Sequence, residues 1–135
     1  MNADETQTVG GDFLFVTHRE RCAEIEKVLA QGNLKVARVE SGGQALAALA
    51  TEPWTVMVAD AQLPDMDGIE LAREALVKKP NMYVLLGDIE PPSENFCNKA
   101  ALSGVAGIVG MPYNPDEVFP LLWSVIEFGS HTQTN

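Results

Sequence analysis

The sequence has few basic residues, and this shortage limits the partners it can bind. Lys and Arg together number 9 against 19 Asp and Glu, so the formal net charge at pH 7 is −10. Such a charge repels the phosphates of nucleic acids and of anionic lipid surfaces. Nucleic acid and membrane are therefore not expected as direct partners.

Cysteine and long hydrophobic runs are also scarce. The 2 cysteines, Cys22 and Cys97, form no C-x-x-C pair and adjoin no cluster of histidines, so they are expected to be reduced core thiols rather than a disulfide framework or a zinc site. The first residues, MNADETQTVGG, lack the cationic and apolar regions of a signal peptide. No apolar run approaches the roughly 18 residues of a membrane helix. We expect a cytoplasmic protein.

The length and composition fit one compact domain. A chain of 135 residues, 46% of them hydrophobic, has room for one core. Residues 1–11 and 129–135 are polar and aperiodic, which predicts two terminal tails. The predicted domain therefore covers residues 12–128.

Within these bounds, short apolar runs alternate with amphipathic segments of helical period. The runs that predict strands are 12–17, 35–39, 55–60, 82–86 and 105–110. Helices are predicted to follow each strand, starting near Arg19, Ser41, Ile69, Ser93 and Asn114, with Ser41 as an N-cap. This alternation predicts an α/β fold, a parallel sheet with helices on both faces.

Reactive groups in such sheets lie beyond the carboxyl ends of the strands. The residues that follow the predicted strands are Thr17, His18, Asp60, Gly87, Asp88, Gly110, Met111 and Pro112. None of them is Lys or Arg. Asp60 is therefore expected to lie near Asp65 and Asp88 without a cation beside it.

The segment DAQLPDMDGIEL, residues 60–71, resembles the receiver domain of two-component response regulators. SGGQAL at 41–46 and the pattern G-x-x-G-I-V-G-M-P at 104–112 fall at matching places, and the resemblance covers nearly all of residues 12–128. It implies a flavodoxin-like, doubly wound sheet of five parallel strands in the order 2-1-3-4-5. It also implies phosphoryl transfer from a histidine kinase to Asp60.

The residues that support this transfer in the family are replaced here. Phosphoryl transfer depends on positioning and on neutralising charge, which the family achieves with Mg²⁺, a lysine and a hydroxyl. Thr17 and His18 stand where the acidic pair would help to hold Mg²⁺, an ion that prefers oxygen ligands. Met111 occupies the position of the lysine, and Gly87 occupies the position of the Ser or Thr.

These replacements favour a pseudo-receiver. Removing one preorganised donor costs ~10²–10³ in rate, and here several are absent together. We therefore expect a non-enzymatic, phosphorylation-independent interaction module of bacterial signalling that requires no cofactor and binds Mg²⁺ weakly at best. Three alternatives stay open: a phosphoacceptor Asp60 in a rebuilt site, a weak metal site from Asp60, Asp88 and Thr17, and a sensor that uses the emptied pocket.

The resemblance also indicates a partner surface. In receivers, the face formed by the fourth helix, fifth strand and fifth helix is the usual site of dimerisation and partner binding. Ile108 replaces the aromatic residue often found in the fifth strand, and Phe119 and Trp123 lie on the last helix. This face is predicted to bind a protein partner or a second copy.

The resemblance further implies that the Met111–Pro112 peptide bond is cis. The side chain of His18 is expected either to form a hydrogen bond with Asp60 or to face solvent.

Overall fold

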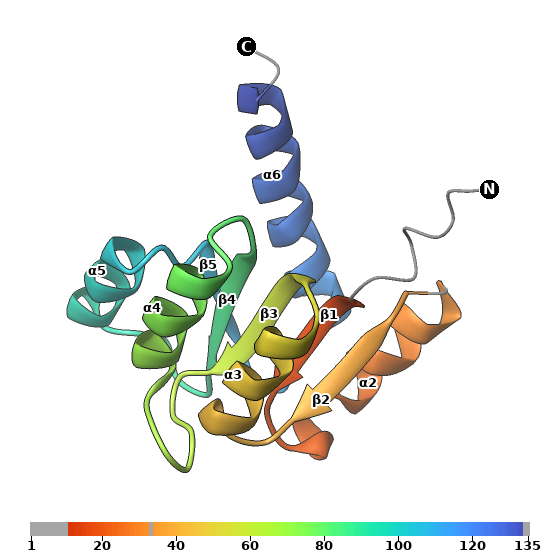
Figure 1. Ribbon diagram of the computed structural model, residues 1–135, viewed down its shortest axis with the longest axis horizontal. Coiled ribbons are helices and arrows are strands. Elements are labelled where there is room, and N and C mark those ends of the chain that lie inside the picture. The colour runs from red at the N-terminus through yellow and green to blue at the C-terminus, as the bar shows by residue number, and fades with distance from the viewer. Residues whose placement is uncertain (1–10, 33, 134–135) are drawn as a thin grey trace.

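The chain folds into five strands that alternate with five helices (Figure 1). The structure, a computed structural model, describes residues 11–32 and 34–133. In chain order the elements are β1 (Gly11–Val16), α2 (Arg19–Gln31), β2 (Val36–Val39), α3 (Gly42–Thr51), β3 (Trp54–Asp60), α4 (Gly68–Lys78), β4 (Tyr83–Asp88), α5 (Glu94–Leu102), β5 (Gly107–Gly110) and α6 (Pro115–Gln133).

The sheet has the order β2-β1-β3-β4-β5, and every neighbouring pair of strands is parallel. This confirms the predicted flavodoxin-like topology. Val16 pairs with Ala59 and Asp60 pairs with Gly87. Asp60 therefore lies at the carboxyl end of the central strand, between the ends of β1 and β4.

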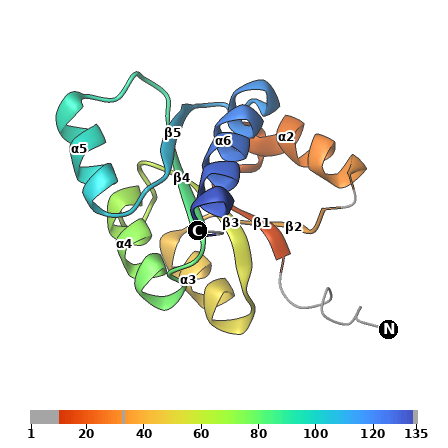
Figure 2. The same cartoon turned by 90° about the horizontal axis from the view of Figure 1, so that it is seen from above.

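Two apolar layers enclose the sheet because successive strand side chains point to opposite faces. Phe13 and Phe15 of β1 face one layer, to which α2 contributes Ile25 and α6 contributes Leu122. The other layer holds alternate strand residues together with side chains of α3, α4 and α5. Figure 2 shows α2 and α6 on one side of the sheet and these three helices on the other.

Three helices begin at residues whose side chains accept a hydrogen bond from a backbone amide of the first turn. Ser41, Asp67 and Ser93 accept these bonds at 3.2, 2.8 and 3.0 Å. Each such N-cap is worth about 1 kcal/mol. The predicted cap at Ser41 is confirmed.

The predicted termini differ from the structure at the last helix. α6 continues to Gln133, with Pro120 inside it, so it passes residue 128, and its last turns extend past the sheet in Figure 1. Gly11 belongs to β1, whereas the rest of the predicted N-terminal tail, residues 1–10, lies outside the described residues, as do residues 134 and 135.

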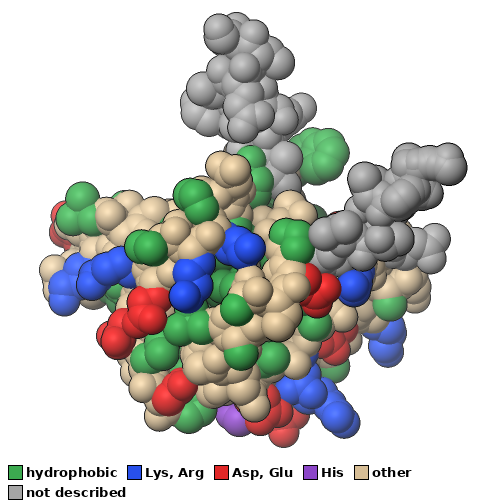
Figure 3. Space-filling view, viewed as in Figure 1, with side chains coloured by type: hydrophobic (Ala, Val, Ile, Leu, Met, Phe, Trp, Pro, Cys, Tyr) green, Lys and Arg blue, Asp and Glu red, His purple; other side chains and the backbone are tan. Residues whose placement is uncertain are grey.

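The outer surface over α3 and α4 mixes acidic, basic and apolar side chains without one dominant patch (Figure 3). Scattered apolar side chains of this kind are normal on a solvated surface. Within residues 11–32 and 34–133, no helix combines the length and the apolarity that crossing a membrane requires.

Candidate functional site around Asp60

Asp60 is buried, and both oxygens of its carboxylate are occupied. Its residue exposure is 2%. The guanidinium of Arg21 donates to Oδ2 at 2.7 Å, and the hydroxyl of Tyr113 donates to Oδ1 at 2.8 Å. A buried carboxylate needs such partners, because burying an unpaired charge is costly. The carboxylate is therefore enclosed by the protein's own side chains.

Arg21 corrects the expectation that no cation lies beside Asp60. It stands on the first turn of α2, which follows β1, and it forms an ion pair with Asp60. The side chain of Arg21 is 34% exposed and that of Asp60 is 3% exposed. The ion pair thus has one end in the core and the other at the surface.

Tyr113 reaches Asp60 from the connection between β5 and α6. It is 1% exposed, and its backbone N–H donates to the carbonyl of Arg21 at 2.8 Å. Burial, and next the negative charge of Asp60, raise the pKa of the Tyr113 hydroxyl. The hydroxyl therefore stays protonated and acts as a hydrogen-bond donor.

Gly87 makes room for this tyrosine. A Cβ atom at position 87 would collide with the hydroxyl and ring atoms of Tyr113. The space beside Gly87 is thus filled by an aromatic side chain. The alternative of a sensor pocket enlarged at Gly87, Gly110 and Met111 is not supported at Gly87, because Tyr113 fills this space.

Thr17 and His18 follow each other at the end of β1, but the first is buried and the second faces solvent. Thr17 is 1% exposed, and its hydroxyl has no hydrogen-bond partner among the described residues. His18 is about half exposed, and its Nδ1 lies 4.0 Å from Glu40 Oε1. Of the two alternatives for His18, the structure supports the solvent-facing one.

Met111 and Asp88 lie at the ends of β5 and β4. Met111 is half-buried and packs against the core layer of α2 and α6, and the Met111–Pro112 bond is cis, as predicted. Asp88 Oδ1 accepts a bond from the Glu90 amide at 3.4 Å. Within the described part of the chain, no group of three or more His, Cys, Asp or Glu side chains is arranged to hold a metal ion.

Asp65 supports the loop after β3. Its two carboxylate oxygens accept hydrogen bonds from the amides of Gly42 and Gly43, each at 2.9 Å. These bonds lower the pKa of Asp65 below its ordinary value. Asp65 therefore ties the loop to the start of α3 instead of adding an acidic group to the Asp60 site.

The three residues predicted for a partner surface differ in exposure. Ile108 and Phe119 are half-buried and pack against the two core layers. Trp123 is 69% exposed. A groove of about 280 Å³ adjoins Ile108 and is also lined by Asp88, Glu90 and Glu117.

Sequence reasoning missed Arg21 and Tyr113 because it considered only the residues next to the strand ends. Tyr113 follows β5 by three positions, and Arg21 follows β1 by five. The signal that could have found them was their closeness in sequence to the same strand ends: Arg21 lies on the first turn of α2, just after His18, and Tyr113 lies in the β5–α6 connection, just after Met111. Cys22, the neighbour of Arg21, is a core thiol as expected, and burial raises its pKa to about 12.

Comparison with known proteins gives one consistent family. The family model described as "Response regulator receiver domain" matches residues 17–119. The response regulator receiver protein CpdR of Brucella abortus is 34% identical over 59 residues, which are 44% of this chain and 49% of CpdR. The aligned region thus spans about half the length of this curated relative.

Solved structures support the fold. A CheY-like response regulator receiver domain protein from Methanospirillum hungatei is 22% identical, with a TM-score of 0.75 over 92% of this chain and 97% of that one. The structure titled BeF3 Activated DrrB Receiver Domain is 23% identical, with a TM-score of 0.70 over 90% and 97% of the two chains.

Proposed function

This chain belongs to the response regulator receiver domain family, and from that premise we propose that it signals by binding proteins without phosphorylation of Asp60. One observation carries the proposal. Both oxygens of the buried Asp60 carboxylate are engaged, one by Arg21 and one by Tyr113. A phosphoryl group would need one of these oxygens and the space around it.

The missing catalytic groups point in the same direction. A transferred phosphoryl group must be oriented and its charge neutralised. Met111 brings no charge, Thr17 and His18 are weak ligands for Mg²⁺, and Gly87 has no hydroxyl. The domain would therefore carry out no turnover, require no cofactor, and act through its surface.

The proposed surface is the one formed by α5, β5 and α6. Trp123 is the best exposed of the predicted contact residues, and large aromatic side chains often supply much of the energy of an interface. The partner would be a protein, with a histidine kinase as one candidate from the family.

The decisive experiment adds Mg²⁺ and beryllofluoride, a phosphoryl mimic, and follows the amide chemical shifts of the full chain by NMR. The proposal expects no site-specific shifts at Asp60 or along α6. Asp60→Asn serves as the matched control for non-specific effects. The DrrB receiver domain, which was solved in a BeF3-activated form, tests the reagents in parallel.

A phosphoacceptor function is the second candidate, and Arg21 favours it. This residue supplies one positive charge in direct contact with Asp60, as a rebuilt site would require. Tyr113 would have to leave the carboxylate first. Shifts that appear in the wild type and vanish in Asp60→Asn would establish this function and refute the leading one.

The surface is tested separately with Trp123→Ala. The substitution is expected to weaken either self-association or capture of a purified partner, because it removes an exposed aromatic anchor. Val77→Ala, which also truncates an exposed apolar side chain but on α4, is the matched control. Unchanged binding and unchanged association in Trp123→Ala would exclude this surface.

A further inference from the structure

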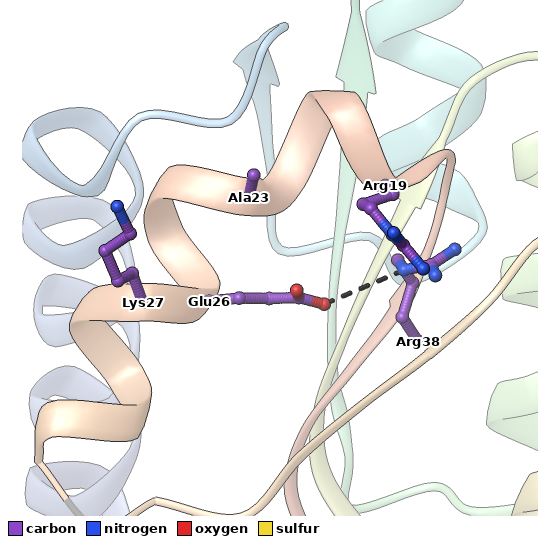
Figure 4. A pocket seen from close by; sticks show the side chains of 5 residues that line it. All are labelled: Arg19, Ala23, Glu26, Lys27 and Arg38. Carbon is purple, nitrogen blue, oxygen red and sulfur yellow. Dashed lines mark ion pairs between the residues drawn. The ribbon is translucent and has the colours of Figure 1, made fainter.

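A basic hollow lies beside β2, at one edge of the sheet. It has a volume of about 550 Å³ and is lined by Arg19, Ala23, Glu26, Lys27 and Arg38 (Figure 4). Four of these residues come from α2 at positions i, i+4, i+7 and i+8, which share one side of a helix. The small side chain of Ala23 leaves the space between Arg19 and Lys27 open.

Of the three positively charged side chains that line this hollow, only one forms ion pairs with acidic residues of the described part of the chain. Arg38 lies 2.9 Å from a carboxylate oxygen of Glu40 and 3.9 Å from one of Glu26. Arg19 and Lys27 form no ion pair with the described residues, and both are exposed. These two side chains are therefore free to bind carboxylates from outside.

The spacing of the two free cations limits what can bind them together. Arg19 and Lys27 are eight positions apart on α2, a rise of about 12 Å along the axis. A single small anion is much shorter than this separation and therefore does not fit both residues well. A chain that carries two acidic side chains about 12 Å apart fits better.

Such a segment stands at the opposite edge of the sheet, in the loop after β4 and the first two residues of α5. Every residue from 89 to 95 is exposed, and Glu90 and Glu94 flank Pro91, Pro92 and Ser93. Ser93 is extended, with φ −74° and ψ 161°, and prolines favour the same conformation. At about 3.1 Å per residue, the four steps from Glu90 to Glu94 span about 12 Å.

We propose that the loop of residues 89–95 docks in the basic hollow of a second copy of this chain, with its two glutamates against Arg19 and Lys27. β2 and β5 are the two edge strands, and Figure 1 shows α2 and α5 on opposite flanks of the molecule. The contact therefore joins unlike surfaces head to tail, and each copy can bind two others. It involves no residue of the Asp60 site, so it goes beyond the proposed function.

The net charge of −10 does not prevent this contact at physiological ionic strength. Repulsion between distant charges is largely screened beyond about 8 Å, whereas opposite charges in contact still attract. Local charge complementarity also selects the orientation, because two basic hollows or two acidic loops repel each other.

The test is sedimentation of the full chain at physiological ionic strength over a range of concentrations. The wild type is expected to form species larger than dimers as concentration rises. Arg19→Glu/Lys27→Glu and Glu90→Lys/Glu94→Lys are each expected to stay monomeric. An equimolar mixture of the two variants should associate again, because the intact loop of one variant meets the intact hollow of the other and the two reversed surfaces are also opposite in charge.

Matched controls separate local contacts from net charge. Lys78→Glu/Lys79→Glu and Glu70→Lys/Glu74→Lys change the net charge by the same amounts on α4 and its C-cap, and should associate as the wild type does. Circular dichroism verifies that every variant is folded. A wild type that is monomeric up to about 1 mM overturns the proposal. So does a mixture that remains monomeric, or association that survives both charge reversals.

Discussion

The ring of Tyr113 occupies the volume that any side chain at Gly87 would need. A Cβ at position 87 would meet the hydroxyl and two ring carbons of Tyr113 at less than van der Waals distance. The hydroxyl that reaches Asp60 and the missing side chain at position 87 are thus one packing arrangement.

Gly87→Ala is expected to destabilise the fold by about 1–3 kcal/mol, because the added methyl group overpacks the site against a buried ring. Urea denaturation measures the loss. Gly110→Ala is the matched control, since a Cβ there meets only a flexible Glu117 oxygen at 3.5 Å. In a Tyr113→Ala background, Gly87→Ala should cost much less, and an equal cost in both backgrounds would show that the two residues are not coupled.

Tyr113→Phe is expected to cost about 1–3 kcal/mol, because it leaves one buried oxygen of Asp60 without its donor. Thermal or urea unfolding measures the change. Tyr83→Phe removes a hydroxyl from a half-buried tyrosine of β4 and serves as the control. A Tyr113→Phe variant as stable as the control would mean that the hydrogen bond to Asp60 contributes nothing.

Arg21→Met is expected to destabilise the protein more than Asp60→Asn. Losing Arg21 leaves a buried carboxylate without a cation, which costs about 3 kcal/mol. Losing the charge of Asp60 leaves Arg21 with access to solvent, because its side chain is 34% exposed, and the new amide still accepts from Tyr113. Paired urea titrations decide the order, and the reverse order would contradict the burial asymmetry.

Asp65 predicts a dependence of stability on acid pH. Bonds from Gly42 and Gly43 hold the pKa of Asp65 below its ordinary value of 3.8, so the folded state binds a proton less readily than the unfolded chain. The stabilisation is present above pH 3.8 and is lost as the pH falls through the folded-state pKa. In Asp65→Asn, the free energy of unfolding should therefore fall less steeply as the pH is lowered into the acid range. Asp116 is an exposed acid on α6, and Asp116→Asn should leave this pH dependence unchanged.

The alternation of strands and helices and the position of Asp60 at a strand end could be predicted from the sequence because they depend on local patterns, whereas the strand order was implied by the resemblance to receiver domains. Apolar runs such as residues 55–60 and helix starts such as Ser41 act through neighbours in the chain. The identity of the groups that contact Asp60 depends on side-chain directions several residues beyond the strand ends. Arg21, on the first turn of α2, and Tyr113, in the β5–α6 connection, lie 39 and 53 positions away from Asp60 in the sequence.

The filling of the space beside Gly87 could not be predicted from the sequence, for a related reason. Replacing a Ser or Thr by glycine removes volume at one position, and sequence alone does not say which distant side chain fills it. Interiors pack densely, so a void beside Asp60 would be unfavourable. The tyrosine two residues after Met111 fills it, and only the packing of the β5–α6 connection against α2 reveals this.

The crowding between positions 87 and 113 also bears on how the site could change. A single substitution that restores a hydroxyl side chain at position 87 places its Cβ inside the space of Tyr113. A single replacement of Tyr113 leaves the site without that hydroxyl and with a vacant volume. Either single substitution therefore gives a destabilised protein, and a route that makes both in turn passes through one of these variants. The present arrangement is one that stepwise mutation cannot easily undo.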